Sequence, residues 1–328
     1  MDTVHPIGNN NNDEIVETMK WDKFLHWYCC KKRRFNNASL DIDFVTRLLS
    51  SLIRADLVYG KPEYINAIFD KALANDEAGL ENVKIDETFG EDNTIDIKKR
   101  HFNELKGVKT QPIFLNDDKT DAQGYMWIKD DKVYITFRGT TSIKDCLADA
   151  NIKLYDWKNK IKIQSGFWVQ FTALESKITK ELKNNSNYNN IKTIILAGHS
   201  LGAAIAQVAA AYYADLFPDK KIISHVCGSP RVGNIDFKNF IESHIHESIR
   251  VANQSDPIAA INAVWGAIHA SKCLLLFQNK SFKLIDADPW YARIKTFWEN
   301  ARMDLLGEHA TSIYVERLEY IINTLKKP

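Results

Sequence analysis

Apolar residues in the first part of the chain recur every three to four positions, the spacing that places them on one face of an α-helix. This spacing predicts helices over residues 19–28, 40–59 and 62–75. A proline at position 62 fits the first turn of the third helix, because its missing N–H would have no intrahelical partner there. The N-terminal part of the chain is therefore predicted to be helical.

The pattern changes near residue 124, where short apolar runs begin. Residues 124–128 and 133–137 flank a polar turn, which predicts a β-hairpin. Helical and strand patterns then alternate: helices at 166–183, 201–216, 237–245, 288–301 and about 311–325, and strands at 193–196, 221–227, 248–252 and 273–277. Such alternation is typical of a largely parallel sheet covered by helices.

No repeat and no long linker interrupts this pattern. We therefore expect one α/β domain over residues 40–328, with a mostly parallel sheet flanked by helices and an N-terminal helical extension. Residues 1–39 are expected to be separate from it, as a polar tail followed by an amphipathic and basic segment.

The most informative motif lies where a predicted strand meets a predicted helix. Residues 194–202 read Ile-Ile-Leu-Ala-Gly-His-Ser-Leu-Gly, and helix-forming residues follow at once. A Gly-x-Ser-x-Gly pattern between a strand and a helix predicts a nucleophile elbow, in which the serine occupies a sharp turn. Ser200 would lie at the positive end of the helix dipole, which favours a developing negative charge.

Composition and charge narrow the class of protein. Of the 328 residues, 45% are hydrophobic and 26% are charged, as in an ordinary globular protein, and the formal net charge is +1. This balance gives no indication of nucleic acid as a partner. The five cysteines are an odd number and lack the spacing of metal ligands. No disulfide framework, metal or organic cofactor is predicted.

The N-terminal residues show neither a signal-peptide pattern nor an apolar run long enough to span a membrane. A cytoplasmic or other intracellular location is expected. Trp27 to Phe35, however, combine interfacial aromatics, two thiols and four consecutive cations, which fits a peripheral contact with anionic lipid. A helix packed on the core with a solvated basic end explains the same residues, and both interpretations stay open.

A serine hydroxyl is a weak nucleophile unless a base accepts its proton and an acid orients that base. In this fold class the partners are expected after strand ends, in the chain order serine, acid, histidine. Asp256 follows the predicted strand at 248–252, and His269 and His309 come after it. An Asp-Pro turn is a second explanation for Asp256.

Three further segments accompany the elbow in chain order. Residues 133–140 read Val-Tyr-Ile-Thr-Phe-Arg-Gly-Thr, residues 228–234 read Gly-Ser-Pro-Arg-Val-Gly-Asn, and residues 250–257 read Arg-Val-Ala-Asn-Gln-Ser-Asp-Pro. Together with the elbow, these motifs resemble the fungal-type, or class 3, lipases of the α/β-hydrolase fold. The resemblance extends from about residue 124 to 309, and weakly from residue 40.

The resemblance implies a role for several residues. Ser200 corresponds to the nucleophile and Asp256 to the acid. In that family a non-catalytic histidine often precedes the strand that His269 precedes here, whereas the base lies before the C-terminal helix, as His309 does. His309 is therefore the expected base. His199, beside the nucleophile, is interpreted as a packing or turn residue.

The resemblance also implies two donors for the oxyanion, Thr140 and the backbone N–H of Leu201. Residues 141–150 resemble the lid of that family, and an ordinary surface helix fits them equally. The candidate lid residues are Ser142, Ile143, Cys146 and Leu147. The family often has a tryptophan where Cys146 stands.

The predicted function is that of a serine carboxylic-ester hydrolase working through an acyl-enzyme intermediate. By the resemblance, a triacylglycerol or another acylglycerol is the expected lipid ester. A phospholipase A1 or a small-ester esterase is the nearest alternative, and a catalytically silent lipase-like scaffold for protein binding is the alternative from another class. Candidates for an acyl site, which core packing explains equally, are Trp265, Ile268, Trp290, Phe297 and Trp298.

Overall fold

The computed structural model describes residues 40–90, 94–140, 153–185, 188–260, 266–285 and 307–326. The chain divides into two units, Met1–Asp41 and Ile42–Pro328, and every helix and strand described below belongs to the second. The predicted helices at 19–28 and 288–301 and the basic segment from Trp27 to Phe35 lie outside the described residues. The predicted boundary after residue 39 stays a prediction.

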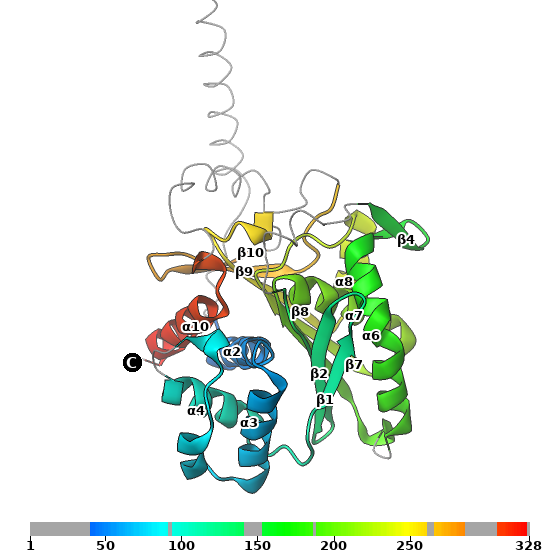
Figure 1. Ribbon diagram of the computed structural model, residues 1–328. Helices are drawn as coiled ribbons and strands as arrows, with labels where there is room; N and C mark the ends of the chain where they lie inside the picture. Colours follow the sequence, from blue (N-terminus) through cyan, green and yellow to red (C-terminus); the bar gives the residue numbers. More distant parts are fainter. Residues whose placement is uncertain are drawn as a thin grey trace, which may run out of the picture. The chain divides into compact units, whose positions relative to one another are not determined.

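An eight-stranded mixed sheet forms the centre of the second unit, in the strand order β1-β2-β3-β6-β7-β8-β9-β10 (Figure 1). The five strands from β3 to β9 in that order run parallel, and β1, β2 and β10 are antiparallel to their neighbours. This is the mostly parallel sheet that the alternating pattern predicts. The strands are β1 (Ile113–Asp117), β2 (Ala122–Lys129), β3 (Lys132–Phe137), β6 (Thr193–His199), β7 (Lys221–Cys227), β8 (Glu247–Asn253), β9 (Lys272–Leu276) and β10 (Phe282–Ile285).

The register of the parallel strands aligns their C-terminal ends. Phe137 of β3 pairs with Gly198 of β6, and His199 pairs with Cys227 of β7. Cys227 pairs in turn with Val251 of β8. The segments that follow these strands therefore leave the sheet at one edge, which is where α/β proteins place their ligands. The residues that follow the strands at this edge include Thr140, Ser200, Gly228 and Asp256.

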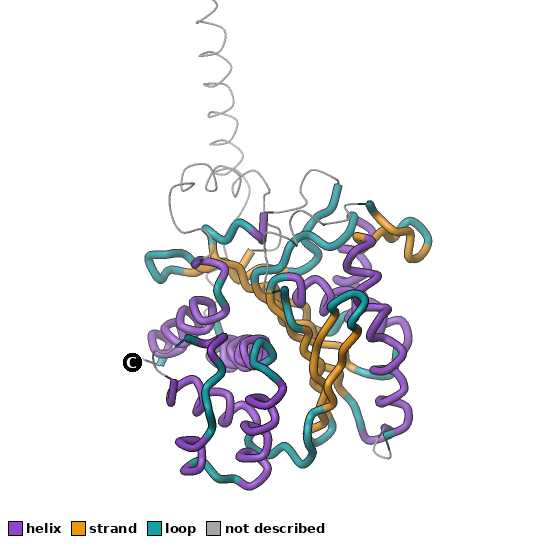
Figure 2. Tube along the Cα trace, in the orientation of Figure 1, coloured by secondary structure: helices purple, strands orange, loops and turns teal. Residues whose placement is uncertain are grey.

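Helices from the beginning and the end of the described chain form the layer on one face of the sheet (Figures 1 and 2). α2 (Ile42–Leu57) packs on β3, β6 and β7, and α10 (Thr311–Leu325) packs along α2. α3 (Pro62–Ala74) and α4 (Thr94–Leu105) extend this layer. The helices predicted at 40–59, 62–75 and 311–325 are thus confirmed, and their apolar stripes face the sheet or one another.

The opposite face is covered by α6 (Ser165–Asn184), α7 (Leu201–Leu216) and α8 (Ile235–His244) (Figure 1). α7 lies directly on β6 and β7 and is buried along most of its length. Its alanine-rich sequence explains this position, because small side chains let a helix approach the sheet closely. The predicted helix at 201–216 has the observed boundaries.

Several elements have weak sequence patterns and were not predicted. α4 buries Lys98 and His101 beside Phe102 and Leu105, so polar residues interrupt its apolar stripe. β1 and β10 are short strands at the two edges of the sheet. β4 (Leu154–Lys158) and β5 (Ile161–Gln164) form a separate hairpin, and β4 has no buried residue.

The remaining elements are single turns of 3₁₀ helix. They are η1 (Ala78–Asn82), η2 (Glu87–Phe89), η3 (Tyr188–Asn190), η4 (Ile258–Ala260) and η6 (Gly307–His309). Of the helices in the described ranges, none combines the length and the apolar character that crossing a bilayer requires.

Candidate active site

Ser200 lies on a sharp turn between β6 and α7. Its backbone has φ 58° and ψ −126°, and a non-glycine residue in such a sparsely populated region stores roughly 1–3 kcal/mol of strain. Two glycines allow the turn to form. A Cβ added to Gly198 would lie 2.3 Å from the Gly202 carbonyl oxygen, and one added to Gly202 would lie 2.3 Å from the Phe137 carbonyl oxygen. The Gly-x-Ser-x-Gly motif therefore forms a strained elbow.

The groups around Ser200 suit a developing negative charge. Leu201 is the first residue of α7, and the first N–H groups of a helix have no intrahelical acceptor. On the other side of Ser200 runs the segment after β3, where a Cβ added to Gly139 would lie 3.2 Å from Ser200 Cβ. Thr140 follows Gly139 and lines a cavity that also reaches His309. Thr140 and Leu201 thus lie in the segments that flank the serine.

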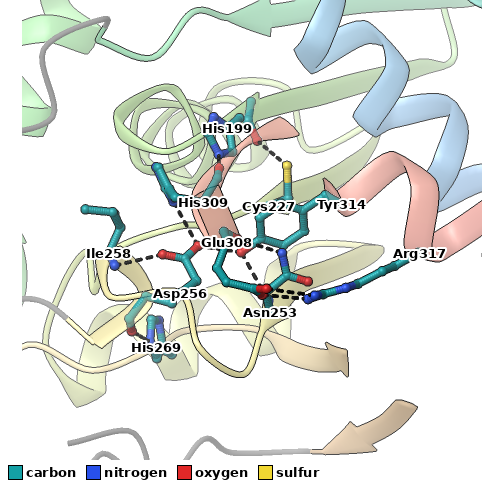
Figure 3. A network of polar contacts seen from close by, with 12 residues as sticks. His199, Cys227, Asn253, Asp256, Ile258, His269, Glu308, His309, Tyr314 and Arg317 are labelled. Atoms are coloured by element: carbon teal, nitrogen blue, oxygen red, sulfur yellow. Dashed lines mark hydrogen bonds and ion pairs between the residues drawn. The ribbon is translucent and has the colours of Figure 1, made fainter. Parts of the chain in front are cut away.

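Asp256 and His309 form a buried pair (Figure 3). His309 donates its Nδ1–H to Asp256 Oδ2 at 2.8 Å, and the same oxygen accepts the Tyr314 hydroxyl at 2.5 Å. Burial alone would raise the pKa of Asp256, but the charge of His309 and the hydrogen bonds from His309 and Tyr314 outweigh burial and lower that pKa below its ordinary value. Asp256 is therefore an ionised acceptor that holds the imidazole in one orientation.

The Asp-Pro turn that offered a second explanation for Asp256 is present as well. Asp256 Oδ1 accepts the N–H of Ile258 at 2.8 Å, which starts the turn of η4 (Figure 3). One carboxylate oxygen thus shapes the turn while the other faces His309. The two interpretations of this residue are compatible.

The second ring nitrogen of His309 is placed to accept a proton. When the ring is neutral and Nδ1 carries its proton, Nε2 carries a lone pair. Nε2 is buried, and among the described residues it has no hydrogen-bond partner. No hydrogen bond joins Ser200 Oγ to this nitrogen within the described residues, and such bonds often tighten only in the substrate complex.

The backbone that carries His309 is held from three directions (Figure 3). Asn253 at the end of β8 donates its side-chain N–H to the Glu308 carbonyl at 2.7 Å, and the Glu308 carboxylate pairs with Arg317 of α10 at 2.9 Å. His199 of the elbow contributes Nε2, 2.6 Å from the His309 carbonyl oxygen. Strand β8, the elbow and α10 therefore fix η6 together.

His199 makes directional contacts in addition to the packing that its sequence position suggested. Burial first, and then the nearby His309, lower its pKa to about 3, so the ring is neutral. Because a carbonyl oxygen can only accept, the proton is assigned to Nε2, and Nδ1 accepts the Tyr59 hydroxyl at 2.8 Å. Tyr59 comes from the turn after α2 and lies against Gly139. The hydrogen bonds from Tyr59 to His199 and from His199 to the His309 carbonyl thus link the N-terminal helical layer to His309.

The stability of the protein is expected to decrease as the pH falls from about 6.5 toward 3. The folded pKa of His199 is below its unfolded value, so the unfolded chain binds more protons in this range, with a slope of up to about 1.4 kcal/mol per pH unit. The lowered pKa of buried His225 acts in the same direction. Urea unfolding between pH 4 and 8 measures the slope. His199→Gln should reduce it and the exposed-site control His244→Gln should not; an unchanged slope in His199→Gln would contradict the assignment.

Gly228, after β7, lies against Asp256 and His309. Its φ is 58°, and an added Cβ would lie 2.9 Å from His309 Cε1 and 3.1 Å from Asp256 Oδ2. Only a glycine therefore fits this position without moving the pair.

Gly228→Ala is expected to lower kcat/KM for ester hydrolysis about 100-fold, because displacing a catalytic group by about 1 Å has an effect of that size. The left-handed backbone should also destabilise the variant by about 1–2 kcal/mol. Gly166→Ala is the matched control, since a Cβ there meets nothing within 4 Å. Steady-state kinetics and urea unfolding compare the two variants, and a wild-type kcat/KM for Gly228→Ala would refute the prediction.

The other candidate histidine lies elsewhere. His269 Nε2 is 2.8 Å from the Ala259 carbonyl oxygen, and it is His309 that the structure brings to Asp256 (Figure 3). Ile268 is half-buried, and its N–H donates to the Gly233 carbonyl. Eight predicted site residues lie outside the described residues: the lid candidates Ser142, Ile143, Cys146 and Leu147, and the acyl-site candidates Trp265, Trp290, Phe297 and Trp298.

Two tyrosines of the site were not found from the sequence. Tyr314 lies one turn into α10, where its ring looks like another residue of the apolar stripe, and only the fold reveals its hydroxyl at Asp256. Tyr59 lies 140 positions before His199, and no local pattern indicates their contact. Within the described ranges, no group of three or more histidine, cysteine, aspartate or glutamate side chains is arranged to hold a metal ion.

The sheet order, the elbow after β6 and the acid after β8 define an α/β-hydrolase. The family model for lipase (class 3) matches residues 134–264, which include the elbow and Asp256. Over this segment the chain is similar to the class 3 lipases.

The chain is also similar in sequence to individual lipases and phospholipases. The chain is 30% identical over 180 residues to the secreted mono- and diacylglycerol lipase A of Penicillium cyclopium, covering 51% of this chain and 56% of that protein. It is 28% identical over 160 residues to phospholipase A1-Ialpha2 of Arabidopsis thaliana, covering 40% of this chain and 33% of that protein. The chain thus spans about half the length of the first relative and a third of the second.

A solved structure shows the same fold over most of the chain. The crystal structure of the mono- and diacylglycerol lipase from Aspergillus oryzae matches with a TM-score of 0.61 and 21% sequence identity, covering 81% of this chain and 94% of that one. At this identity the likeness shows the fold alone.

Proposed function

We propose that the protein is a serine carboxylic-ester hydrolase that acts on lipid esters. The observation that carries the proposal is the buried Asp256–His309 pair, in which His309 Nε2 has no hydrogen-bond partner among the described residues, and the strained turn at Ser200 supports it. The match of residues 134–264 to the class 3 lipase model supports the same reaction. Asp256, His309 and Ser200 have the roles of acid, base and nucleophile in this proposal.

The first half of the reaction forms an acyl-enzyme. Ser200 Oγ attacks the ester carbonyl carbon as His309 Nε2 accepts the serine proton, while Asp256 stays ionised and stabilises the imidazolium. The negative charge on the former carbonyl oxygen is stabilised by the N–H of Leu201 and by Thr140, and losing one such donor typically costs about 100- to 1000-fold in rate. The tetrahedral intermediate collapses when His309 returns the proton to the leaving alcohol.

The second half releases the acid. A water molecule attacks the acyl carbon with His309 as base, and the bond to Ser200 Oγ breaks as the serine regains its proton. Every proton moves through one ring nitrogen, which explains why the His309 backbone needs several supports.

Acylglycerols are the proposed substrate class. The relative from Penicillium cyclopium is named a mono- and diacylglycerol lipase, and the relative from Arabidopsis thaliana is named a phospholipase A1. A phospholipase is therefore the second candidate. Initial rates on mono-, di- and triacylglycerols, phosphatidylcholine and a soluble short-chain ester, all with one acyl chain, compare the classes. Faster hydrolysis of phosphatidylcholine than of every acylglycerol would overturn the first choice.

The proposed location is intracellular, with a contact at a lipid surface through Trp27 to Phe35. Two interfacial aromatics and four adjacent cations support binding to anionic membranes. Sedimentation with vesicles that contain phosphatidylserine tests this contact. Changing Lys31, Lys32, Arg33 and Arg34 to glutamine should abolish co-sedimentation, and unchanged co-sedimentation would refute the contact.

A further inference from the structure

A cavity of about 450 Å³, whose lining combines a larger apolar part with several polar and charged groups, lies between His309 and Thr140 on one side and the helical layer of α2, α4 and α10 on the other. Its volume lies within the usual range for small-molecule sites. Besides Tyr59 and His199, five polar or charged residues line it beyond the proposed catalytic groups: Asp56, Thr88, Arg100, Thr311 and Ser312. All five come from outside residues 134–264, the segment that the family model matches.

Asp56 supplies a fixed negative acceptor in this cavity. The residue is buried, and its carboxylate accepts hydrogen bonds from the Thr311 hydroxyl and, at 3.1 Å, from His101 Nε2. Burial alone would raise the pKa of Asp56, but the hydrogen bond and charge of His101, together with Thr311 and Arg100, lower it below the ordinary value. Asp56 is therefore ionised, and each oxygen can accept a further hydrogen bond.

Donors lie in the same cavity. Glu319 accepts from Arg100 Nε at 3.0 Å and from Nη2 at 3.3 Å, which orients the guanidinium. Arg100 is partly exposed and Ser312 is exposed, and among the described residues neither Arg100 Nη1 nor the Ser312 hydroxyl has a hydrogen-bond partner. The cavity thus presents an acceptor at Asp56 and unused donors at Arg100 and Ser312.

These groups distinguish three classes of ligand. An acyl chain would remove water from Asp56 and Arg100 without replacing its hydrogen bonds, which is costly. A phosphate would be repelled by Asp56, and the positive charge of Arg100 is already balanced by Glu319. An uncharged polyol can both donate to Asp56 and accept from Arg100, while its C–H groups contact Phe89 and Ile97, which also line the cavity.

We propose that this cavity binds the alcohol part of the ester and selects an uncharged, hydroxyl-rich alcohol, the chemistry shared by glycerol and sugars. This inference rests on the proposed function. His309 must lie beside the leaving oxygen, because it returns the proton to that oxygen, and the cavity begins at His309. The alcohol released by the reaction therefore enters the space in front of Asp56 and Arg100.

The first test compares soluble butanoate esters of glycerol, propanol and glycerophosphocholine. The wild-type kcat/KM is expected to be at least about tenfold higher for the glycerol ester than for the other two, because a site built to bind hydroxyl groups discriminates against analogues without them. The glycerol-to-propanol ratio of kcat/KM should fall about tenfold in Arg100→Gln and also in Ser312→Ala. Arg47→Gln is the matched control, since Arg47 forms an exposed ion pair with Glu247 far along α2, and it should retain the wild-type ratio.

A second measurement needs no variant. The bond from the acyl carbon to Ser200 Oγ also breaks when an alcohol attacks in place of water, giving a new ester and free serine, with the proton of the alcohol passing through His309 to Ser200. With equal concentrations of glycerol and propanol present, the wild-type protein should form the glycerol ester in at least about fivefold excess, because the cavity that binds the leaving alcohol also binds the entering one.

The possible results distinguish failure of the cavity assignment from failure of the proposed function. Equal transfer to the two alcohols, or a glycerol-to-propanol ratio that neither Arg100→Gln nor Ser312→Ala changes, would overturn the cavity assignment while ester hydrolysis continued. A higher kcat/KM for the glycerophosphocholine ester than for the glycerol ester would show that the cavity prefers a charged head group. That result would also overturn the cavity assignment. Absence of hydrolysis for every ester would instead refute the proposed function.

Discussion

Ser200→Ala is expected to lower kcat for ester hydrolysis about a millionfold, the size of effect seen when a serine hydrolase loses its nucleophile. The alanine has no oxygen that can attack the acyl carbon, and the other groups of the site can contribute only residual catalysis. Hydrolysis of a soluble butanoate ester measures the loss. Ser243→Ala, which removes an exposed hydroxyl from α8, should retain the wild-type rate.

The stability of the Ser200 variants provides a separate check on the elbow. Ser200 has φ 58°, where a side chain costs more than a glycine does. Ser200→Gly should therefore be more stable than Ser200→Ala by roughly 1–3 kcal/mol in urea unfolding. Equal stability of the two variants would show that the backbone of the elbow is not strained.

His309→Ala is expected to lower kcat by about 10⁵- to 10⁶-fold, because loss of the base leaves the serine proton without an acceptor. Asp256→Asn, which removes the negative charge, should lower kcat about 10⁴-fold. The imidazole of His309 then loses the acceptor that fixes its proton on Nδ1. In the double variant His309→Ala/Asp256→Asn, the loss of kcat should be smaller than the two single losses combined. The reason is that Ser200, Asp256 and His309 act as a unit.

The matched control for His309 is His269→Ala. His269 bonds to the Ala259 carbonyl, so its loss should cost roughly 1–3 kcal/mol of stability and leave kcat within about tenfold of wild type. A loss of activity confined to His269→Ala would reverse the assignment of the base. Activity should be compared at a temperature where urea unfolding shows both variants to be folded.

Most of the fold could be predicted from the sequence because its central elements have strong, regular patterns. The parallel strands β6, β7 and β8 are continuous apolar runs, and α7 combines small residues with helix formers. β4 and α4 were missed because their stability depends on tertiary contacts. β4 is a partly exposed edge strand, and α4 buries a lysine and a histidine that only the surrounding helices can satisfy.

The sequence indicated the residues proposed to react, but it did not indicate the residues that hold them in position. Ser200 and Asp256 belong to motifs with local meaning, a turn between strand and helix and a turn after a strand. The supports depend on contacts between distant segments: Tyr59 with His199, Asn253 with the Glu308 carbonyl, and Tyr314 with Asp256. No spacing along one segment encodes such contacts, so the fold was needed to find them.

The helical layer before residue 106 has a larger part in the site than its weak resemblance to the family suggested. Tyr59 follows α2 and reaches the elbow, while Asp56 and Arg100 line the cavity beside His309. These residues lie outside the segment that the family model matches. In the proposed mechanism, specificity for the alcohol can therefore vary independently of Ser200 and Asp256, which lie in the matched segment, and of His309, which lies in η6.

Intact-protein mass spectrometry after reaction with a soluble fluorophosphonate tests the central claim most directly, because the reagent bonds to an activated serine. A single adduct is expected on the peptide that contains Ser200, with no adduct in Ser200→Ala and strongly slowed labelling in His309→Ala, while His269→Ala and wild type should label alike. An unlabelled wild-type protein, or equal labelling of wild type and Ser200→Ala, would contradict the assignment of Ser200 as the nucleophile.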